Sequence, residues 1–171
     1  ALASWLDARA LQGEWPVRIE DIDGPRCIEG AAANILQQLA LCGLHPDGEV
    51  LYQSSRNNIY QQALNQLIGR GLAYPCACTR KEIEEHQASL GLSLARHQTA
   101  VYPGTCKSGL NGKAARAWRF NVSQWSKLRG TPKVHWIDRR LGTQLQNVQD
   151  EVGDFVVKRA DGMWAYQLAV V

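Results

Sequence analysis

The chain has 171 residues, a net charge of +3 and a composition that is 45% hydrophobic and 20% charged. This length can bury one substantial core, so we expect a soluble globular domain with an insertion. No apolar run approaches the roughly 20 residues that a membrane-spanning helix needs. The cysteines number five and no secretory signal opens the chain, which argues against a disulfide framework and favours a reducing compartment, the cytoplasm.

The first part of the chain alternates between helical and extended patterns. Apolar residues recur every three or four positions in the helical segments, and a serine can cap the third of them. The predicted elements are, in order, a helix over 1–12, a strand over 15–23, a helix over 29–42, a helix from Ser54 or Ser55 to Gly69, and a strand over 72–75. This order is compatible with an α/β fold, in which Cys27 and Cys42 would pack as small apolar residues in or beside a helix.

Two acidic residues, Glu20 and Asp21, stand near the end of the first predicted strand. Ligands of an α/β sheet bind in the crevice beyond the strand ends, so a carboxylate at the end of a buried strand is a candidate binding residue. The alternative is a structural role, in which both acids form ion pairs with Arg18 and Arg26.

Three cysteines stand at spacings that suit a metal. Cys76 and Cys78 follow the strand over 72–75, and Cys106 comes after a Pro-Gly turn. Alternate residues of a strand point to the same side, and their α-carbons lie about 6.5 Å apart. A tetrahedral zinc ion with Zn–S bonds of about 2.3 Å holds its sulfurs about 3.8 Å apart, which converging side chains can reach. The three thiols therefore predict a zinc site.

The fourth zinc ligand has more than one candidate. Tyr102 stands four residues before Cys106 on the other side of the turn, and a bound cation could lower the pKa of its phenol from about 10. His97 and His86 are the alternative ligands. The alternative to a zinc site as such is a bare turn that contains buried thiols.

The remainder of the chain adds a helix and several strands. Thr79 can cap a short acidic helix over 81–86, and the stretch to Ala100 is an insertion between the metal ligands. Strands are expected over 117–122, 134–137 and 154–158. Because the chain opens without a helix start signal and closes on the apolar run 164–171, we expect it to be a fragment of a longer protein.

The stretch from Lys107 to Gln149 carries nine basic residues and a single acid, Asp138. We call this stretch the basic block. Trp118, Trp125 and Trp136 lie among its bases. Basic residues mixed with aromatic residues are typical of a surface that binds nucleic acid. The alternative is a set of solvated strand faces with a few core tryptophans.

Three stretches of the chain carry information about its family. They are the run Val17-Arg18-Ile19-Glu20-Asp21-Ile22-Asp23-Gly24-Pro25-Arg26, the set Cys76-x-Cys78 with Tyr102-x-x-x-Cys106, and the run Asp154-Phe155-Val156-Val157-Lys158-Arg159-x-Asp161-Gly162. Together they resemble the catalytic domain of the glutamyl-tRNA synthetase family. The full-length synthetases often have a histidine two residues after the third cysteine, where this chain has Ser108, so the pattern resembles that of a short paralogue.

The resemblance implies the α/β fold of a class I aminoacyl-tRNA synthetase catalytic domain, a Rossmann-like parallel sheet with a zinc-bearing insertion. It implies a partial catalytic core over 1–75, a zinc-bearing and basic insertion over 76–149, and a return to the truncated core over 150–171. The family activates glutamate with ATP and Mg²⁺ and then transfers it. The short paralogue transfers it to the queuosine base of tRNA(Asp).

By resemblance, Glu20 and Tyr166 bind the substrate glutamate, with Glu20 facing the ammonium group. Val170 stands where the family often has asparagine, a departure that the short paralogue shares. The His-x-Gly-His and Lys-x-Ser-Lys signatures of the family's ATP site are absent from these 171 residues, so the resemblance assigns no catalytic residue and implies that this fragment alone is inactive. The alternatives are an ordinary glutamyl-tRNA synthetase and a non-catalytic zinc-dependent module that binds RNA.

Overall fold

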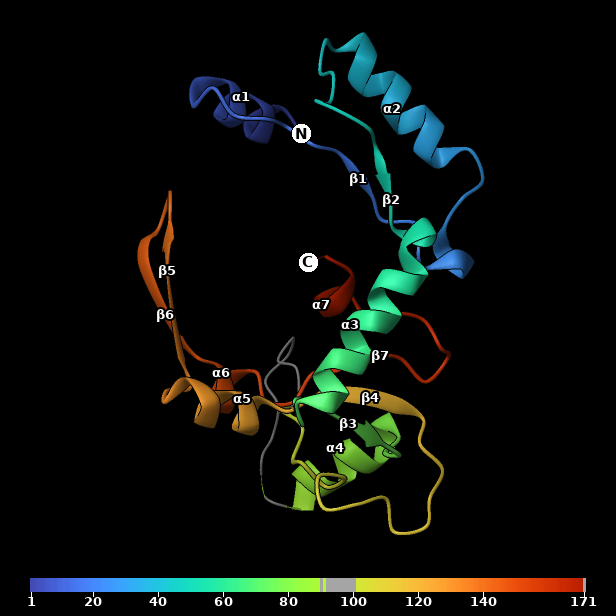
Figure 1. The fold of residues 1–171 in the computed structure, drawn as a ribbon, viewed down its shortest axis with the longest axis vertical. Coiled ribbons are helices and arrows are strands. Elements are labelled where there is room, and N and C mark those ends of the chain that lie inside the picture. Colours follow the sequence, from blue (N-terminus) through green and yellow to red (C-terminus); the bar gives the residue numbers. More distant parts are fainter. Residues whose placement is uncertain (90, 92–100, 171) are drawn as a thin grey trace. The chain divides into compact units, whose positions relative to one another are not determined.

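The computed structural model describes residues 1–89, 91 and 101–170 (Figure 1). It divides into two compact units, Ala1–Ile59 and Tyr60–Val171, and the boundary falls inside one helix. The first unit contains α1 (Leu2–Ala10), β1 (Arg18–Ile19), η1 (Gly24–Arg26), α2 (Ala31–Leu41), β2 (Leu51–Tyr52) and η2 (Gln53–Arg56). Each unit is described here by itself.

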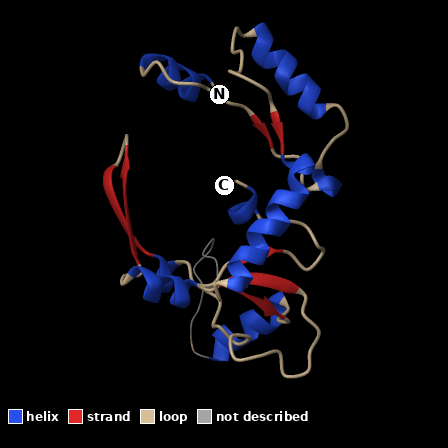
Figure 2. Cartoon of the chain, viewed as in Figure 1, coloured by secondary structure: helices blue, strands red, loops and turns tan. Residues whose placement is uncertain are grey.

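The helix that crosses the boundary is α3 (Asn57–Gly69). The elements that follow it in the second unit are β3 (Ala73–Cys76), α4 (Arg80–Ser89), β4 (Ala117–Phe120), α5 (Val122–Arg129), β5 (Lys133–Asp138), β6 (Gly142–Asn147), α6 (Val148–Glu151), β7 (Val156–Lys158) and α7 (Tyr166–Ala169). Figure 2 shows that both units contain helices and strands, as an α/β protein requires. No helix within the described ranges is long and apolar enough to cross a membrane.

The first unit is organised around Asp47. Its carboxylate accepts a hydrogen bond of 2.8 Å from the Trp15 backbone N–H and one of 2.7 Å from the Arg9 guanidinium. The buried Trp15 ring also donates to the Ser4 hydroxyl at 3.0 Å. These bonds tie α1 to the segment that leads into β1.

The first predicted strand is much shorter than expected. Instead of running over 15–23, it is limited to β1, whose two residues pair in parallel with Leu51 and Tyr52 of β2. Arg18 is exposed and Ile19 is half-buried, so the prediction of a buried strand is wrong. The ladder ends there because the chain turns toward η2, where the Asp21 carboxylate accepts from the Ser54 N–H at 2.8 Å and from its hydroxyl at 2.6 Å.

Two further expectations for the first unit are wrong. Neither serine caps α3, because Ser54 binds Asp21, the Ser55 hydroxyl donates to the Tyr52 carbonyl at 2.8 Å, and the chain enters the helix through η2. Cys27 and Cys42 are exposed and not packed against a helix face, since each lies at the end of a helical segment.

The second unit is built on a three-stranded antiparallel sheet in the order β3-β4-β7. Helix α3 supplies Tyr60 and Leu64 to its core, where the Tyr60 hydroxyl donates to the Ala169 carbonyl at 3.2 Å. The Tyr60 and Trp164 rings lie 5.8 Å apart between centroids. The expected parallel sheet is therefore represented by β1 and β2, whereas the sheet of the second unit is antiparallel.

Helix α4 begins where the sequence predicted a cap. The Thr79 hydroxyl accepts from the Glu82 N–H at 3.2 Å, and the Glu82 carboxylate accepts from the Thr79 N–H at 2.7 Å. This reciprocal pair is a capping box, which satisfies two N–H groups that a helix end otherwise leaves without partners.

The strand predicted over 117–122 ends at Phe120, because Asn121 caps α5. Its side chain accepts a hydrogen bond from the Gln124 N–H at 3.2 Å. Strands β5 and β6 then form a hairpin, drawn in orange in Figure 1, in full antiparallel register from the Lys133–Asn147 pair to the Asp138–Gly142 pair. The sequence predicted β5 and missed its partner.

Candidate metal centre

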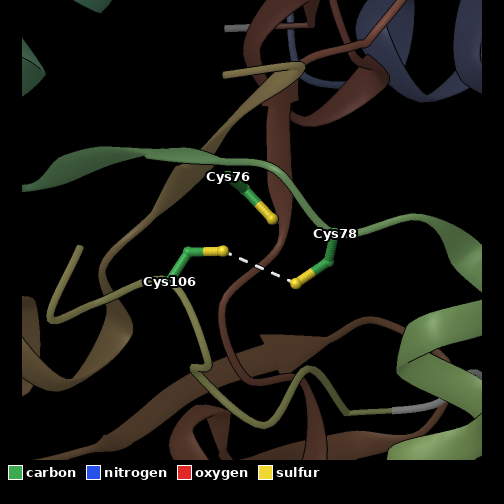
Figure 3. Close-up of side chains that lie close together, drawn as sticks. All are labelled: Cys76, Cys78 and Cys106. Atoms are coloured by element: carbon green, nitrogen blue, oxygen red, sulfur yellow. Dashed lines mark hydrogen bonds between the residues drawn. The ribbon is translucent and has the colours of Figure 1, made fainter. Parts of the chain in front are cut away.

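Three thiol groups of the second unit converge on one point (Figure 3). Cys76 is the last residue of β3, Cys78 follows it by two positions, and Cys106 comes from the loop that precedes β4. The three sulfur atoms lie within 4.8 Å of one another, and the sulfurs of Cys78 and Cys106 are 3.5 Å apart. The structure thus brings together the three cysteines that the sequence selected.

The phenol of Tyr102 reaches the same point. Its oxygen lies 3.4 Å from the Cys76 sulfur and 3.3 Å from the Cys78 sulfur. It also accepts a hydrogen bond of 3.0 Å from the backbone N–H of Cys106. The side chain is buried, so the oxygen faces the thiols and not the solvent.

Of the two histidines considered as alternative ligands, the structure describes only His86. His86 is exposed on α4 and does not belong to the group of side chains that converge with the thiols. His97 lies outside the described residues. Of the two candidates that the structure describes, Tyr102 therefore reaches the thiols and His86 does not.

The donors suit a tetrahedral ion of soft character. Sulfurs that share a zinc ion lie about 3.8 Å apart. The sulfurs of Cys78 and Cys106 are 3.5 Å apart, and no two of the three sulfurs are more than 4.8 Å apart. Thiolates select zinc over hard cations such as Mg²⁺ and Ca²⁺, which prefer oxygen ligands. Three thiols with one phenol oxygen therefore form a candidate zinc site.

Hydrogen bonding and burial separate the pKa values of these donors. Burial opposes ionisation of Cys106, but hydrogen bonds with Tyr102 and the Ala77 N–H outweigh it and lower the pKa of this thiol to about 7. Burial raises the pKa of Cys78, and the neighbouring Cys106 raises it further. Burial and the surrounding thiols also raise the pKa of Tyr102. Cys106 is therefore more readily available than Cys78 as a thiolate, the form that binds metal.

Two glycines, one across from Tyr102 and one after it in the loop, shape the backbone around this residue. Tyr102 forms an isolated parallel bridge with Gly153, which has a φ of +64° and no room for a side chain, since an added Cβ would lie 2.5 Å from Val101 Cγ1. Gly104 has a φ of +82°, and its carbonyl accepts from the Lys107 N–H at 2.9 Å. This turn folds the third cysteine back toward the first two, as the Pro-Gly signal predicted.

Sequence reasoning missed two residues that support the thiols. The Arg119 Nε–H donates to the Cys76 sulfur at 3.3 Å. The buried Asp154 carboxylate accepts from the Tyr74 phenol at 2.5 Å and pairs with the Lys107 ammonium at 2.9 Å. Arg119 was counted among the bases of the basic block, and nothing in the spacing shows that it points to the thiols.

The two residues expected to bind glutamate lie in different units. Glu20 directly follows β1, is exposed, and pairs with the Arg18 guanidinium at 3.4 Å, the contact that a structural role predicts. Asp21 instead binds Ser54. Tyr166 is the first residue of α7 and is 65% exposed, so its side chain is open to a ligand.

The basic block divides between inward and outward side chains. Trp118 and Trp125 are half-buried, whereas Trp136 on β5 is 44% exposed. The hairpin presents exposed bases at Lys133 and at its turn, Arg139 and Arg140. The hairpin is therefore the part of the block that best combines exposed charge with an exposed aromatic ring.

Comparison with known proteins relates the whole chain to one family. Residues 1–171 match the family described as tRNA synthetases class I (E and Q), catalytic domain. The chain is 53% identical over 186 residues to the glutamyl-Q tRNA(Asp) synthetase of Albidiferax ferrireducens and 56% identical over 174 residues to that of Leptothrix cholodnii. Both matches cover 100% of this chain but only 60% and 57% of those relatives. The chain thus spans little more than half the length of the curated relatives it matches.

Solved structures give the same fold at lower identity. A glutamate tRNA ligase from Elizabethkingia meningosepticum, in complex with its amino acid, superposes with a TM-score of 0.69 at 23% identity and covers 99% of this chain and 36% of that one. The glutamate-tRNA synthetase of Elizabethkingia anophelis gives a TM-score of 0.68, also at 23% identity, and covers 97% of this chain and 36% of that one. The likeness establishes the fold of a class I synthetase catalytic domain.

Proposed function

The chain belongs to the family of class I tRNA synthetase catalytic domains for glutamate and glutamine, and from this we propose that it is part of an enzyme that glutamylates tRNA. In this proposal the enzyme activates glutamate with ATP and Mg²⁺ and transfers it to the queuosine base of tRNA(Asp). The observation that carries it is identity of 53% and 56%, over the whole chain, to relatives named glutamyl-Q tRNA(Asp) synthetase. The reaction would take place in the cytoplasm, where the substrate tRNA is found.

The metal belongs to the same proposal. The three thiols and the Tyr102 phenol would hold one structural zinc ion, within an insertion over 76–149 that interrupts a catalytic core over 1–75 and 150–171. The convergence of the donors within 4.8 Å and the burial of Cys76, Cys106 and Tyr102 support this role. A site with four protein donors leaves no open position for substrate, which favours a structural ion over a catalytic one.

Glutamate would be bound by Glu20 and Tyr166. A carboxylate that faces the substrate ammonium forms a charge-assisted hydrogen bond, about twice as strong as a neutral one. Both side chains are exposed and so can meet a ligand. No residue of this chain is proposed as catalytic.

Transfer of labelled glutamate tests the proposal. The protein from the complete gene would be incubated with glutamate, ATP and Mg²⁺, and with tRNA(Asp) that contains or lacks queuosine. We expect glutamate to be attached only to the tRNA that contains queuosine. Attachment to tRNA(Glu) would instead identify an ordinary glutamyl-tRNA synthetase, the kind of enzyme for which the two solved structures are named. A protein that binds RNA and zinc but never activates glutamate would be a non-catalytic module.

A further inference from the structure

One guanidinium touches two of the four donors at once. The Arg119 Nε–H donates to the Cys76 sulfur at 3.3 Å, and its guanidinium carbon lies 3.8 Å from the centroid of the Tyr102 ring. The Nη1 group donates to the backbone carbonyl of Asp154 at 2.8 Å. The guanidinium of Arg119 therefore stacks on the Tyr102 ring, donates through Nε to Cys76 and donates through Nη1 to Asp154.

The strand register explains how Arg119 reaches the thiols. In the β3–β4 pair, Tyr74 is opposite Arg119 and Cys76 is opposite Ala117. Cys76 and Arg119 are thus diagonal neighbours on adjacent strands, about 7–8 Å apart at their α-carbons, a gap that a long side chain can cross. Residues two apart on a strand share a face, so the register directs both side chains to the same side of the sheet.

The contact with Arg119 would offset the net charge of the site when zinc is bound. A zinc ion contributes two positive charges, whereas three thiolates contribute three negative charges, so the buried group is net negative. A charge buried without a partner is costly, and a guanidinium in hydrogen-bonding contact offsets part of that cost. Arg119 is half-buried, which protects the contact from water.

The far end of Arg119 is hydrogen-bonded to a buried residue, Asp154. Asp154 is 4% exposed, and its carboxylate also accepts from the Val122 N–H at 2.9 Å and pairs with the Lys107 ammonium at 2.9 Å. Lys107 directly follows Cys106 in the chain. Two cations, one beside the first thiol and one beside the third, therefore end on the same buried aspartate.

We propose that Arg119 is a positioning residue of the metal centre, whose planar guanidinium fixes the directions of the Cys76 sulfur and the Tyr102 ring and offsets the charge of the bound thiolates. This inference rests on the proposed zinc ion. Partners of metal ligands commonly contribute about 10- to 100-fold to metal affinity. Lysine cannot stack on a ring and bond at its edge in the same way, so the inference assigns the role to arginine and not to positive charge alone.

The test compares three variants of the protein from the complete gene. Arg119→Lys keeps the charge, Arg119→Gln removes it, and Arg129→Lys is the matched control. Arg129 stacks over Trp125 at 5.0 Å, as Arg119 stacks over Tyr102, but it lies on α5. Zinc affinity is measured by competition with a chromophoric chelator, and ligand geometry by the visible spectrum of the cobalt-substituted protein.

We expect both Arg119 variants to bind zinc about 10- to 100-fold more weakly and to give an altered cobalt spectrum, while the control is unchanged. Arg119→Lys with the affinity and spectrum of the natural protein would overturn the inference and leave the zinc site intact. A natural protein that binds no zinc would overturn the metal proposal as well.

Should the Arg119 variants not fold, the natural protein still provides a test. The Nε–H signals of its arginines can be followed by NMR during zinc titration. One signal must be shielded from solvent exchange and shift as the sulfur that accepts its hydrogen bond becomes a metal ligand. If no arginine signal behaves in this way, Arg119 does not position the centre.

Discussion

At the scale of single residues, the donors of the metal centre are of two chemical kinds, and their removal should differ. A water molecule can replace a lost phenol oxygen as a zinc ligand, but it is a poor replacement for a lost thiolate. We expect about one zinc per chain, its loss in Cys78→Ala, and only weakened binding in Tyr102→Phe. Elemental analysis measures the metal content, with the exposed Cys42→Ala as control. Full metal content in Cys78→Ala would show that the cluster is not the zinc site.

The protonation of the thiols makes metal binding depend on pH. The pKa of Cys106 is lowered to about 7, so this thiol is already ionised above pH 7 and becomes protonated as the pH falls through that value. The raised pKa of Cys78 means that this thiol must still release a proton when metal binds at neutral pH. We therefore expect zinc affinity to fall steeply below about pH 7, where protons compete at both sulfurs. Calorimetry in buffers of different ionisation enthalpy counts the protons released, and an affinity independent of pH would contradict this.

Glu20 can be either a ligand of glutamate or a partner of Arg18. An exposed ion pair contributes little, whereas a lost bond to a bound ammonium costs a few kcal/mol, on the order of a hundredfold in glutamate-dependent activation. We expect Glu20→Gln to raise the glutamate requirement sharply and to leave the ATP requirement nearly unchanged, as measured by pyrophosphate exchange. Arg18→Gln is the matched control. Equal effects of the two substitutions, together with earlier melting, would make Glu20 a structural residue.

At the scale of elements, the β5–β6 hairpin is the part of the basic block that we propose to contact tRNA. Trp136 and Ile137 are 44% and 80% exposed on β5, beside the bases of the turn. When basic side chains bind the phosphates of tRNA, counterions condensed on the tRNA are released, so the affinity should fall steeply as the salt concentration rises. An exposed aromatic side chain such as Trp136 can also stack on unpaired nucleobases of the RNA.

Reversal of charge at the turn tests the hairpin. We expect Arg139→Glu with Arg140→Glu to weaken tRNA binding and to reduce its salt dependence, while glutamate activation remains nearly intact. The control reverses Arg80 and Lys81, exposed bases of α4 outside the block. Filter binding over a series of salt concentrations measures both quantities. Unchanged affinity would leave the hairpin bases as an ordinary solvated surface.

The elements also show which structural features are visible in a sequence. Two local signals were confirmed, the Thr79 cap and the Pro-Gly turn before Cys106, because both depend on residues a few positions apart. The predicted serine cap of α3 failed because a distant residue, Asp21, binds Ser54. Strand β6 was missed because its sequence, GTQLQN, lacks the β-branched alternation of a typical strand and depends on its pairing with β5.

The metal centre was visible only in part for the same reason. Its thiols follow from spacing near one turn, but Arg119 contacts Cys76 across 43 positions and Tyr74 contacts Asp154 across 80. Contacts of this kind depend on sheet register, which no local pattern specifies. The short β1 was overestimated because the β-branched run around it continues past the point where β2 stops pairing.

At the scale of the whole molecule, the three thiols and the phenol of the proposed zinc site all belong to the unit Tyr60–Val171. Removal of the ion should therefore loosen that unit locally. We expect a chelator to increase hydrogen exchange in β3 and in the loop of Tyr102 and Cys106, with little change in Ala1–Ile59. Mass spectrometry of peptides before and after chelation measures this, and zinc added back is the control. A uniform increase over both units would mean that the ion stabilises the entire chain.

Gly153 limits how this region can evolve. Its φ of +64° strains any residue with a side chain, and an added Cβ would lie 2.5 Å from Val101 Cγ1, so the Val101 side chain would have to move. Every replacement of glycine by another amino acid introduces a Cβ, so each such replacement at this position meets the same strain. The exposed turn of the hairpin has no such constraint. Related sequences should therefore keep glycine at position 153 by purifying selection, whereas residues 139 and 140 need only keep a basic side chain that can contact tRNA.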